Sequence, residues 1–160
     1  MEVEKEVERI NARFRRDDWQ PILLLEKHHS HAEIAPFYKA ADVCMVTSLH
    51  DGMNLVAKEF VMARSDEKGV LILSQFTGAA RELSDALIVN PYDIVQMAEA
   101  IAEALKMSED EQTERMHTMR EVLRERNIYR WAADLVGELA QVRLSGNPRV
   151  NNLEKSSLAR

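Results

Sequence analysis

Short apolar runs alternate with amphipathic stretches along the first ninety residues of the chain. Runs of three or four apolar residues have the length of strands buried on both faces of a sheet. Such runs occur at Ile22–Leu25, Val43–Val46, Val70–Leu73 and Leu87–Val89. Helical spacing between them predicts helices at about 31–39 and 54–63 and a helical turn near 79–83. Strands that alternate with helices predict an α/β fold, a Rossmann-like parallel sheet of about four strands with flanking helices.

Helical patterns also occupy both ends of the chain. Residues 1–16 carry apolar residues at helical spacing, and two pairs typical of helix starts, Asp93 with Gln96 and Ser108 with Glu111, follow the last apolar run. A final helix over 128–144 places five apolar residues on one stripe: Ile128, Trp131, Leu135, Leu139 and Val142. We therefore expect one domain over residues 1–144, while the polar residues 145–160 are typical of a disordered tail.

Composition narrows the functional class. Hydrophobic residues at 46% and charged residues at 30% are those of an ordinary soluble protein, and a net charge of −6 disfavours a nucleic-acid binder. The single cysteine, Cys44, cannot form an internal disulfide, which fits a reducing compartment. No signal-peptide pattern or long apolar stretch is present, so the sequence predicts a cytoplasmic protein without a membrane partner.

The stretch of residues 51–59, DGMNLVAKE, is the leading candidate for chemistry. It follows a predicted strand and opens a predicted helix, and ligands of open parallel sheets bind at this end of a strand. Unpaired N–H groups and the positive end of the helix dipole favour phosphate there. Gly52 allows close backbone approach or a positive φ, and Asp51 offers a carboxylate. The alternative is an ordinary turn, because Asp-Gly is common in turns and Asn54 is a usable helix N-cap.

The cluster His28, His29 and His31 is a second candidate, for a metal. It has no cysteine beside it and does not follow zinc-finger spacing, so a solvated loop is the favoured interpretation and no metal is expected. Met116 and Met119 are likewise interpreted as packing residues rather than a binding surface.

Three ordered motifs together resemble the trehalose-6-phosphate synthases, a family of retaining glycosyltransferases. They are residues 47–59, TSLHDGMNLVAKE, residues 74–80, SQFTGAA, and residues 86–93, ALIVNPYD. The resemblance runs from about residue 10 to 144. It implies GT-B architecture, in which two Rossmann-like domains face each other across a cleft, and it identifies 1–144 as part of the C-terminal, nucleotide-sugar-binding domain. It also implies that the N-terminal acceptor domain and the opening strands of this domain are missing.

The resemblance implies roles for individual residues. The family transfers glucose from UDP-glucose to glucose 6-phosphate without a metal. Asp51 matches the catalytic-site acid that contacts hydroxyl groups of the donor glucose, and Glu59 matches the carboxylate that accepts both ribose hydroxyls. Ile34 falls where the family docks uracil. The backbone cradle for diphosphate and sugar matches Gly52, Met53, Asn54, Leu55 and Val56. The family's usual Pro-Leu-Arg is here Ser48-Leu49-His50, which leaves the donor base and the acceptor open.

Two other functions stay open. The same scaffold serves enzymes with another acceptor, such as glucosylglycerol-phosphate synthase, and a non-catalytic nucleotide-binding interaction module keeps the fold without the reaction. Because half of the cleft is missing, we expect the chain to be inactive alone. A homodimer through the stripe of the last helix, or through an open sheet edge, is also expected.

Overall fold

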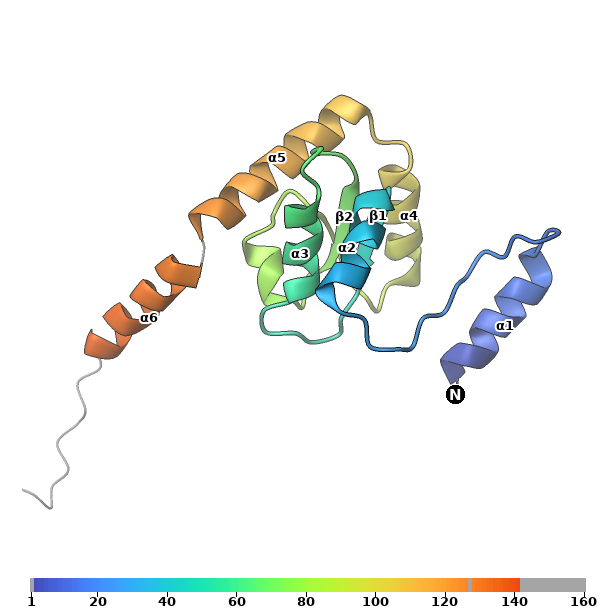
Figure 1. Ribbon diagram of the computed structural model, residues 1–160, viewed down its shortest axis with the longest axis horizontal. Helices are drawn as coiled ribbons and strands as arrows, with labels where there is room; N and C mark the ends of the chain where they lie inside the picture. The colour runs from blue at the N-terminus through green and yellow to red at the C-terminus, as the bar shows by residue number, and fades with distance from the viewer. Residues whose placement is uncertain (1, 127, 142–160) are drawn as a thin grey trace, which may run out of the picture. The chain divides into compact units, whose positions relative to one another are not determined.

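The computed structural model describes residues 2–126 and 128–141, which form ten elements of secondary structure (Figure 1). The chain divides into two compact units, Met1–Phe37 and Tyr38–Arg160. The first unit contains α1 (Glu2–Phe14), and α2 (His31–Ala40) runs from the first unit into the second. Helices at 1–16 and 31–39 were predicted, and both are confirmed.

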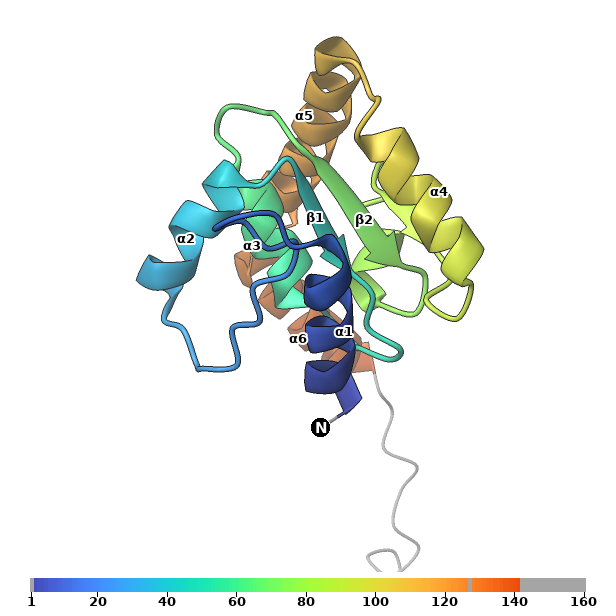
Figure 2. The same cartoon turned by 90° about the vertical axis from the view of Figure 1, so that its right-hand side faces the viewer.

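The second unit is built on a parallel sheet in the order β1 (Val43–Val46), β2 (Val70–Ser74) and β3 (Leu87–Val89). The remaining elements of this unit are α3 (Leu55–Ala63), η1 (Gly78–Arg81), α4 (Ile94–Ala104), α5 (Glu109–Glu125) and α6 (Ile128–Gln141). Helices α3 and α5 lie on one face of the sheet and α4 on the other (Figure 2). The α/β fold and three of the four predicted strands are thus confirmed.

Alternation along β2 divides the core between these two faces. Leu71 and Leu73 point to one side and pack with residues of α3 and α5, among them Phe60 and Met116. On the other side, Val70 and Ile72 of β2 and Val89 of β3 pack against Ala100 and Ala104 of α4. All five β2 residues are buried, because a central parallel strand has helices on both faces. The packing interpretation of Met116 and Met119 is confirmed, since both lie in the core.

The predicted strand at Ile22–Leu25 is wrong. These residues lie in an irregular segment, with Leu23 74% and Leu25 56% exposed. A strand requires a neighbouring strand to pair its backbone groups, and no described strand pairs with this segment. Instead the side-chain amide of Asn11 takes the place of a peptide group: its Nδ2 donates to the Ile22 carbonyl and its Oδ1 accepts from the Ile22 N–H, both at 2.9 Å.

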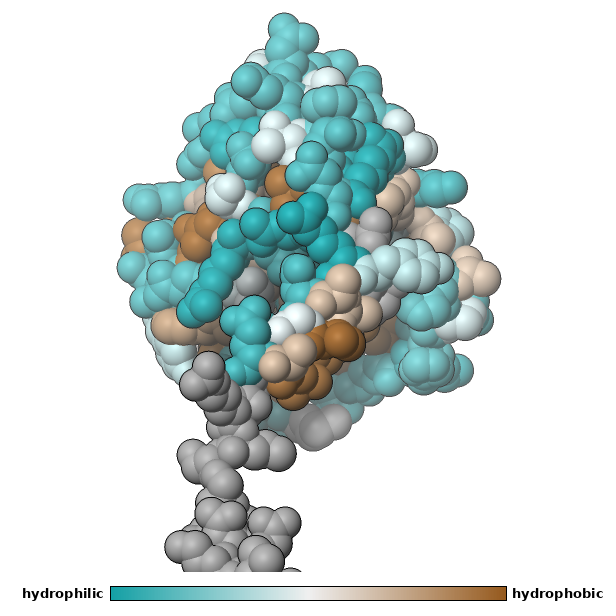
Figure 3. All heavy atoms as spheres, turned by 90° about the vertical axis from the view of Figure 1, so that its left-hand side faces the viewer, coloured by the Kyte–Doolittle hydropathy of each residue, from teal (hydrophilic) through white to brown (hydrophobic). Residues whose placement is uncertain are grey.

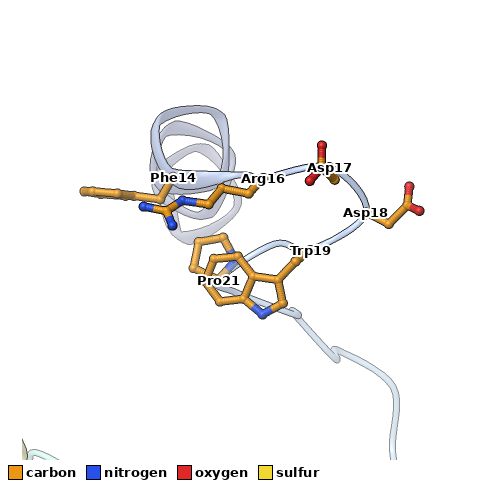
Figure 4. A pocket seen from close by; sticks show the side chains of 6 residues that line it. All are labelled: Phe14, Arg16, Asp17, Asp18, Trp19 and Pro21. Atoms are coloured by element: carbon orange, nitrogen blue, oxygen red, sulfur yellow. The ribbon is translucent and has the colours of Figure 1, made fainter.

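The first unit also holds a tight turn that frames a surface pocket. The backbones of Arg16 and Trp19 exchange hydrogen bonds of 3.0 and 2.8 Å, and Asp17 between them has φ 47°. Figure 4 shows the rings of Phe14 and Trp19 at the pocket, while Asp17 and Asp18 point away from them. Both rings are more than half exposed, so the pocket is an open surface hollow.

The part of the predicted apolar stripe that the structure describes is exposed on helix α6. Trp131, Leu135 and Leu139 are all exposed, Leu139 by 61%. Figure 3 views the side of the molecule that carries this helix and shows hydrophobic groups as a brown patch among hydrophilic ones. Val142 and the predicted tail 145–160 lie outside the described residues.

Candidate functional site

Two loops meet at the carboxyl ends of adjacent parallel strands. Residues 47–54 connect β1 to α3, and residues 75–77 connect β2 to η1. The loops are tied by two backbone hydrogen bonds, from Asp51 N–H to the Phe76 carbonyl at 3.4 Å and from Gly78 N–H to the Asp51 carbonyl at 2.9 Å. This is the edge of the sheet where ligands of open α/β folds bind. The candidate stretch predicted from the sequence therefore stands on a fixed support.

The Asp51 carboxylate organises its own loop. Its Oδ1 accepts the backbone N–H groups of Met53 at 3.1 Å and Asn54 at 2.9 Å, and its Oδ2 accepts the Asn54 side-chain amide at 3.0 Å. The backbone bonds from Met53 and Asn54 hold the pKa of Asp51 below its ordinary value, because they stabilise the charged form. Asp51 is therefore ionised at neutral pH, and it fills an anion position at the start of α3.

Asn54 begins α3 from a left-handed backbone conformation. Its φ is 56°, a region in which asparagine is among the few tolerated residues with a side chain, and only 4% of its surface is exposed. The side-chain Oδ1 accepts the Ala57 N–H at 2.9 Å, which confirms Asn54 as the N-cap of this helix. Asn54 thus links Asp51 to the first turn of α3 and fixes the direction in which that helix leaves the loop.

Glycine acts here through close approach rather than through a positive φ. Gly52 does not have a positive φ, and a Cβ built on it would meet no heavy atom within 4 Å. The close contact lies at Gly78 instead, where a Cβ would come within 1.9 Å of the Gly52 carbonyl oxygen. The Gly52 side of the loop is therefore open to a ligand, while Gly78 lets the second loop support it from behind.

The start of α3 offers hydrogen-bond donors beside this open side. The N–H groups of Gly52, Leu55 and Val56 donate no hydrogen bond to any residue that the structure describes. Helices leave such first-turn N–H groups without an intrahelical partner, and a phosphate is a suitable acceptor for them. Of the five amides predicted as a cradle, the other two, from Met53 and Asn54, donate to Asp51 in this structure.

Glu59 lies one turn further along α3 and is half buried. Its Oε2 accepts a hydrogen bond of 3.2 Å from the hydroxyl of Tyr38, near the end of α2. No local signal could have shown the contact, because the two residues are 21 positions apart and meet only when α2 and α3 pack together.

The remaining sequence candidates do not add to this cluster. Ile34 lies in the first half of α2, which belongs to the first unit. Its role in docking uracil stays a prediction. His50, the histidine of the loop, is exposed, and its charge lowers the pKa of Asp51 in addition to the larger effect of the backbone hydrogen bonds from Met53 and Asn54. Within residues 2–126 and 128–141, no group of three His, Cys, Asp or Glu side chains could hold a metal ion. No helix in those ranges is long and apolar enough to cross a membrane.

Comparison with known proteins gives one consistent result. Residues 1–141 match the model of glycosyltransferase family 20. The chain is 48% identical over 138 residues to a bifunctional trehalose-6-phosphate synthase/phosphatase of Thermoproteus tenax, which covers 86% of the chain and 19% of that protein. It is 44% identical over 137 residues to a glucosylglycerol-phosphate synthase of a Picosynechococcus species, covering 86% of the chain and 27% of that protein.

A solved structure with the same fold is similar over nearly the same range. It is an α,α-trehalose-phosphate synthase (UDP-forming) from Burkholderia xenovorans in complex with glucose-6-phosphate. The TM-score is 0.83 at 48% identity, and the match covers 87% of this chain and 31% of that one. The chain therefore spans between about a fifth and a third of the length of these relatives.

Proposed function

Because the chain belongs to glycosyltransferase family 20, we propose that it is the donor-binding part of a retaining glucosyltransferase of the trehalose-6-phosphate synthase type. The donor is UDP-glucose. The acceptor is a sugar phosphate, which binds to the part of such enzymes that this chain does not span. The observation that carries the proposal is the loop of residues 51–56, which holds a carboxylate and open N–H donors at the carboxyl end of β1.

The geometry of the loop supports a division of labour along the donor. The N–H groups of Gly52, Leu55 and Val56 bind the diphosphate, where the helix dipole adds to their attraction. Asp51 lies at the tip and accepts hydroxyl groups of the donor glucose. Glu59, further from the tip, accepts the two ribose hydroxyls, a bidentate contact that suits a carboxylate.

In the family, such a loop contributes to the reaction through positioning and charge. A nucleotide sugar that is already held in its reactive orientation loses no further orientational freedom when it reacts. N–H groups aimed at the diphosphate stabilise the charge that develops there as UDP departs. These contributions require the acceptor on the opposite side of the cleft. The chain alone is therefore expected to bind UDP but to form no trehalose 6-phosphate, which an assay for that product would test.

A calorimetric titration with UDP tests the donor site. Glu59→Ala should weaken UDP binding by about 1.5–3 kcal/mol, the value of a hydrogen bond to a charged group. Glu99→Ala on the exposed face of α4 removes the same side chain far from the loop in sequence and should bind UDP as the wild type does. Equal affinity of wild type and Glu59→Ala would contradict the ribose role, and no binding of UDP by the wild type would contradict the proposed function.

A second acceptor class is favoured by one observation, the 44% identity to a glucosylglycerol-phosphate synthase. The donor loop would be the same in both enzymes, because the reactions differ in the acceptor. A version of the protein with a complete acceptor domain would decide between them: the product made from UDP-glucose with glucose 6-phosphate or with glycerol 3-phosphate identifies the acceptor.

A further inference from the structure

The contact between Tyr38 and Glu59 joins two helices at the candidate site. Tyr38 lies near the end of α2 and Glu59 in the middle of α3, and both side chains are half buried. The phenol hydroxyl donates to Glu59 Oε2 at 3.2 Å. A glutamate on a helix surface has several rotamers of similar energy, so a directed hydrogen bond from a fixed donor selects among them.

Tyr38 is itself fixed in place from two directions. Its ring packs edge-on against the ring of Phe60, with centroids 6.3 Å apart and an interplanar angle of 75°. Its backbone carbonyl accepts from the guanidinium of Arg64 at 3.3 Å, which also donates to the carbonyls of Lys39 at 2.8 Å and Ala41 at 2.7 Å. Arg64 directly follows α3 and is 5% exposed, so the end of α2 is clamped to the helix that carries Glu59.

The direction of the hydrogen bond is constant over the physiological pH range. Burial, followed by the charge of Glu59 and the hydrogen bond to it, raises the pKa of Tyr38 to about 12. The phenol of Tyr38 therefore stays protonated and keeps its hydrogen to donate to Glu59. A carboxylate accepts about four hydrogen bonds, so the bond from Tyr38 is compatible with two more from a vicinal diol.

We propose that Tyr38 is a positioning residue that holds the Glu59 carboxylate in the orientation that receives the ribose diol of the nucleotide. The inference rests on the proposed donor site. A purely structural Tyr38 would affect every ligand of the loop equally, whereas a positioning Tyr38 affects the recognition of the diol. The ratio of affinities for UDP and 2′-deoxy-UDP separates these two roles.

The test uses the whole chain and calorimetry with both nucleotides. The wild type should prefer UDP to 2′-deoxy-UDP by about tenfold or more, the value of one hydrogen bond to a charged group. In Tyr38→Phe, which keeps the ring and its contact with Phe60, UDP affinity should fall by about three- to tenfold. The affinity for 2′-deoxy-UDP, which keeps only one of the two hydroxyls that Glu59 accepts, should fall less, so that the preference for UDP shrinks. In a Glu59→Ala background, Tyr38→Phe should cause no further loss of UDP affinity.

Tyr92→Phe is the matched control, because it removes an equal hydroxyl from a tyrosine that is 67% exposed and stacks edge-on with Phe76. It should keep the wild-type preference. An unchanged preference in Tyr38→Phe, or equal losses for both nucleotides, would overturn the positioning role while the donor site stands. A wild type that binds neither nucleotide would overturn the donor site and this inference together.

Discussion

Gly78→Ala is the substitution through which the support of the loop can be measured. The new Cβ would lie 1.9 Å from the Gly52 carbonyl oxygen and 2.9 Å from its carbonyl carbon. Ordinary van der Waals contact begins near 3.4 Å, so the two loops must separate by about 1.5 Å at this point. Both atoms belong to the backbone, and no flexible side chain can move aside. The hydrogen bond from Gly78 N–H to the Asp51 carbonyl, now 2.9 Å, would be lost or badly stretched.

The expected cost follows from these two effects. Overpacking costs about 1–3 kcal/mol and a lost hydrogen bond about 1 kcal/mol, so the free energy of unfolding should fall by about 2–4 kcal/mol. In Gly78→Ala molecules that remain folded, Asp51 and the start of α3 are displaced. Their UDP affinity should fall by about tenfold or more, because N–H groups that have moved by about 1 Å no longer reach the same phosphate oxygens.

Denaturant unfolding and a UDP titration on the same samples measure both quantities. Gly137→Ala in α6 is the control: a Cβ there meets nothing within 4 Å, and alanine favours a helix interior by about 0.5–1 kcal/mol. It should unfold at the same or a higher denaturant concentration and bind UDP normally. A Gly78→Ala variant with wild-type stability and wild-type UDP affinity would refute the view that this glycine sets the position of the donor loop.

Further substitutions probe the loop and α6. Asn54→Ala should lower the free energy of unfolding by about 2–3 kcal/mol, because it removes the N-cap oxygen and the side-chain hydrogen bonds that support the left-handed backbone at this residue. Asn54→Gly should lose less, since glycine adopts a positive φ without strain, and similar losses in denaturant melts would contradict this. The lowered pKa of Asp51 contributes stability that is present above about pH 4 and is lost as the pH falls through the pKa of the folded state. Asp51→Asn should therefore lose less stability than the wild type on acidification, and parallel stability–pH profiles of the two proteins would argue against this role of Asp51. The exposed stripe of α6 should make the chain self-associate and a Trp131→Asp, Leu135→Asp variant monomeric, and light scattering that finds both monomeric would exclude that interface.

The strands that were predicted correctly share a property that is local in sequence. β1 and β2 are apolar runs that follow a polar or glycine residue, β3 is an apolar run that ends at Asn90, and their helices follow at the expected distances. The run at Ile22–Leu25 has the same local pattern but lacks a paired neighbour among the described residues. Whether a run becomes a strand depends on that neighbour, which no local pattern contains.

The candidate site divides in the same way. The position of the loop and the N-cap role of Asn54 could be predicted, because an acid-glycine turn between strand and helix is a local signal. The residue with positive φ was placed at Gly52 as one possibility, but the structure has it at Asn54, where the bonds to Asp51 and Ala57 determine the backbone. The close approach at Gly78 was missed, since it depends on how two loops meet.

The hydrogen bonds of the Asp51 carboxylate complicate the customary alanine scan of such a site. Truncation of this side chain would remove the proposed sugar contact and, at the same time, release two backbone N–H groups and the Asn54 amide. A dead Asp51→Ala variant would therefore not reveal which loss mattered. Asp51→Asn keeps a carbonyl oxygen that can accept from the Met53 and Asn54 N–H groups while it removes the charge, so the amide variant separates a collapsed loop from a missing ligand contact.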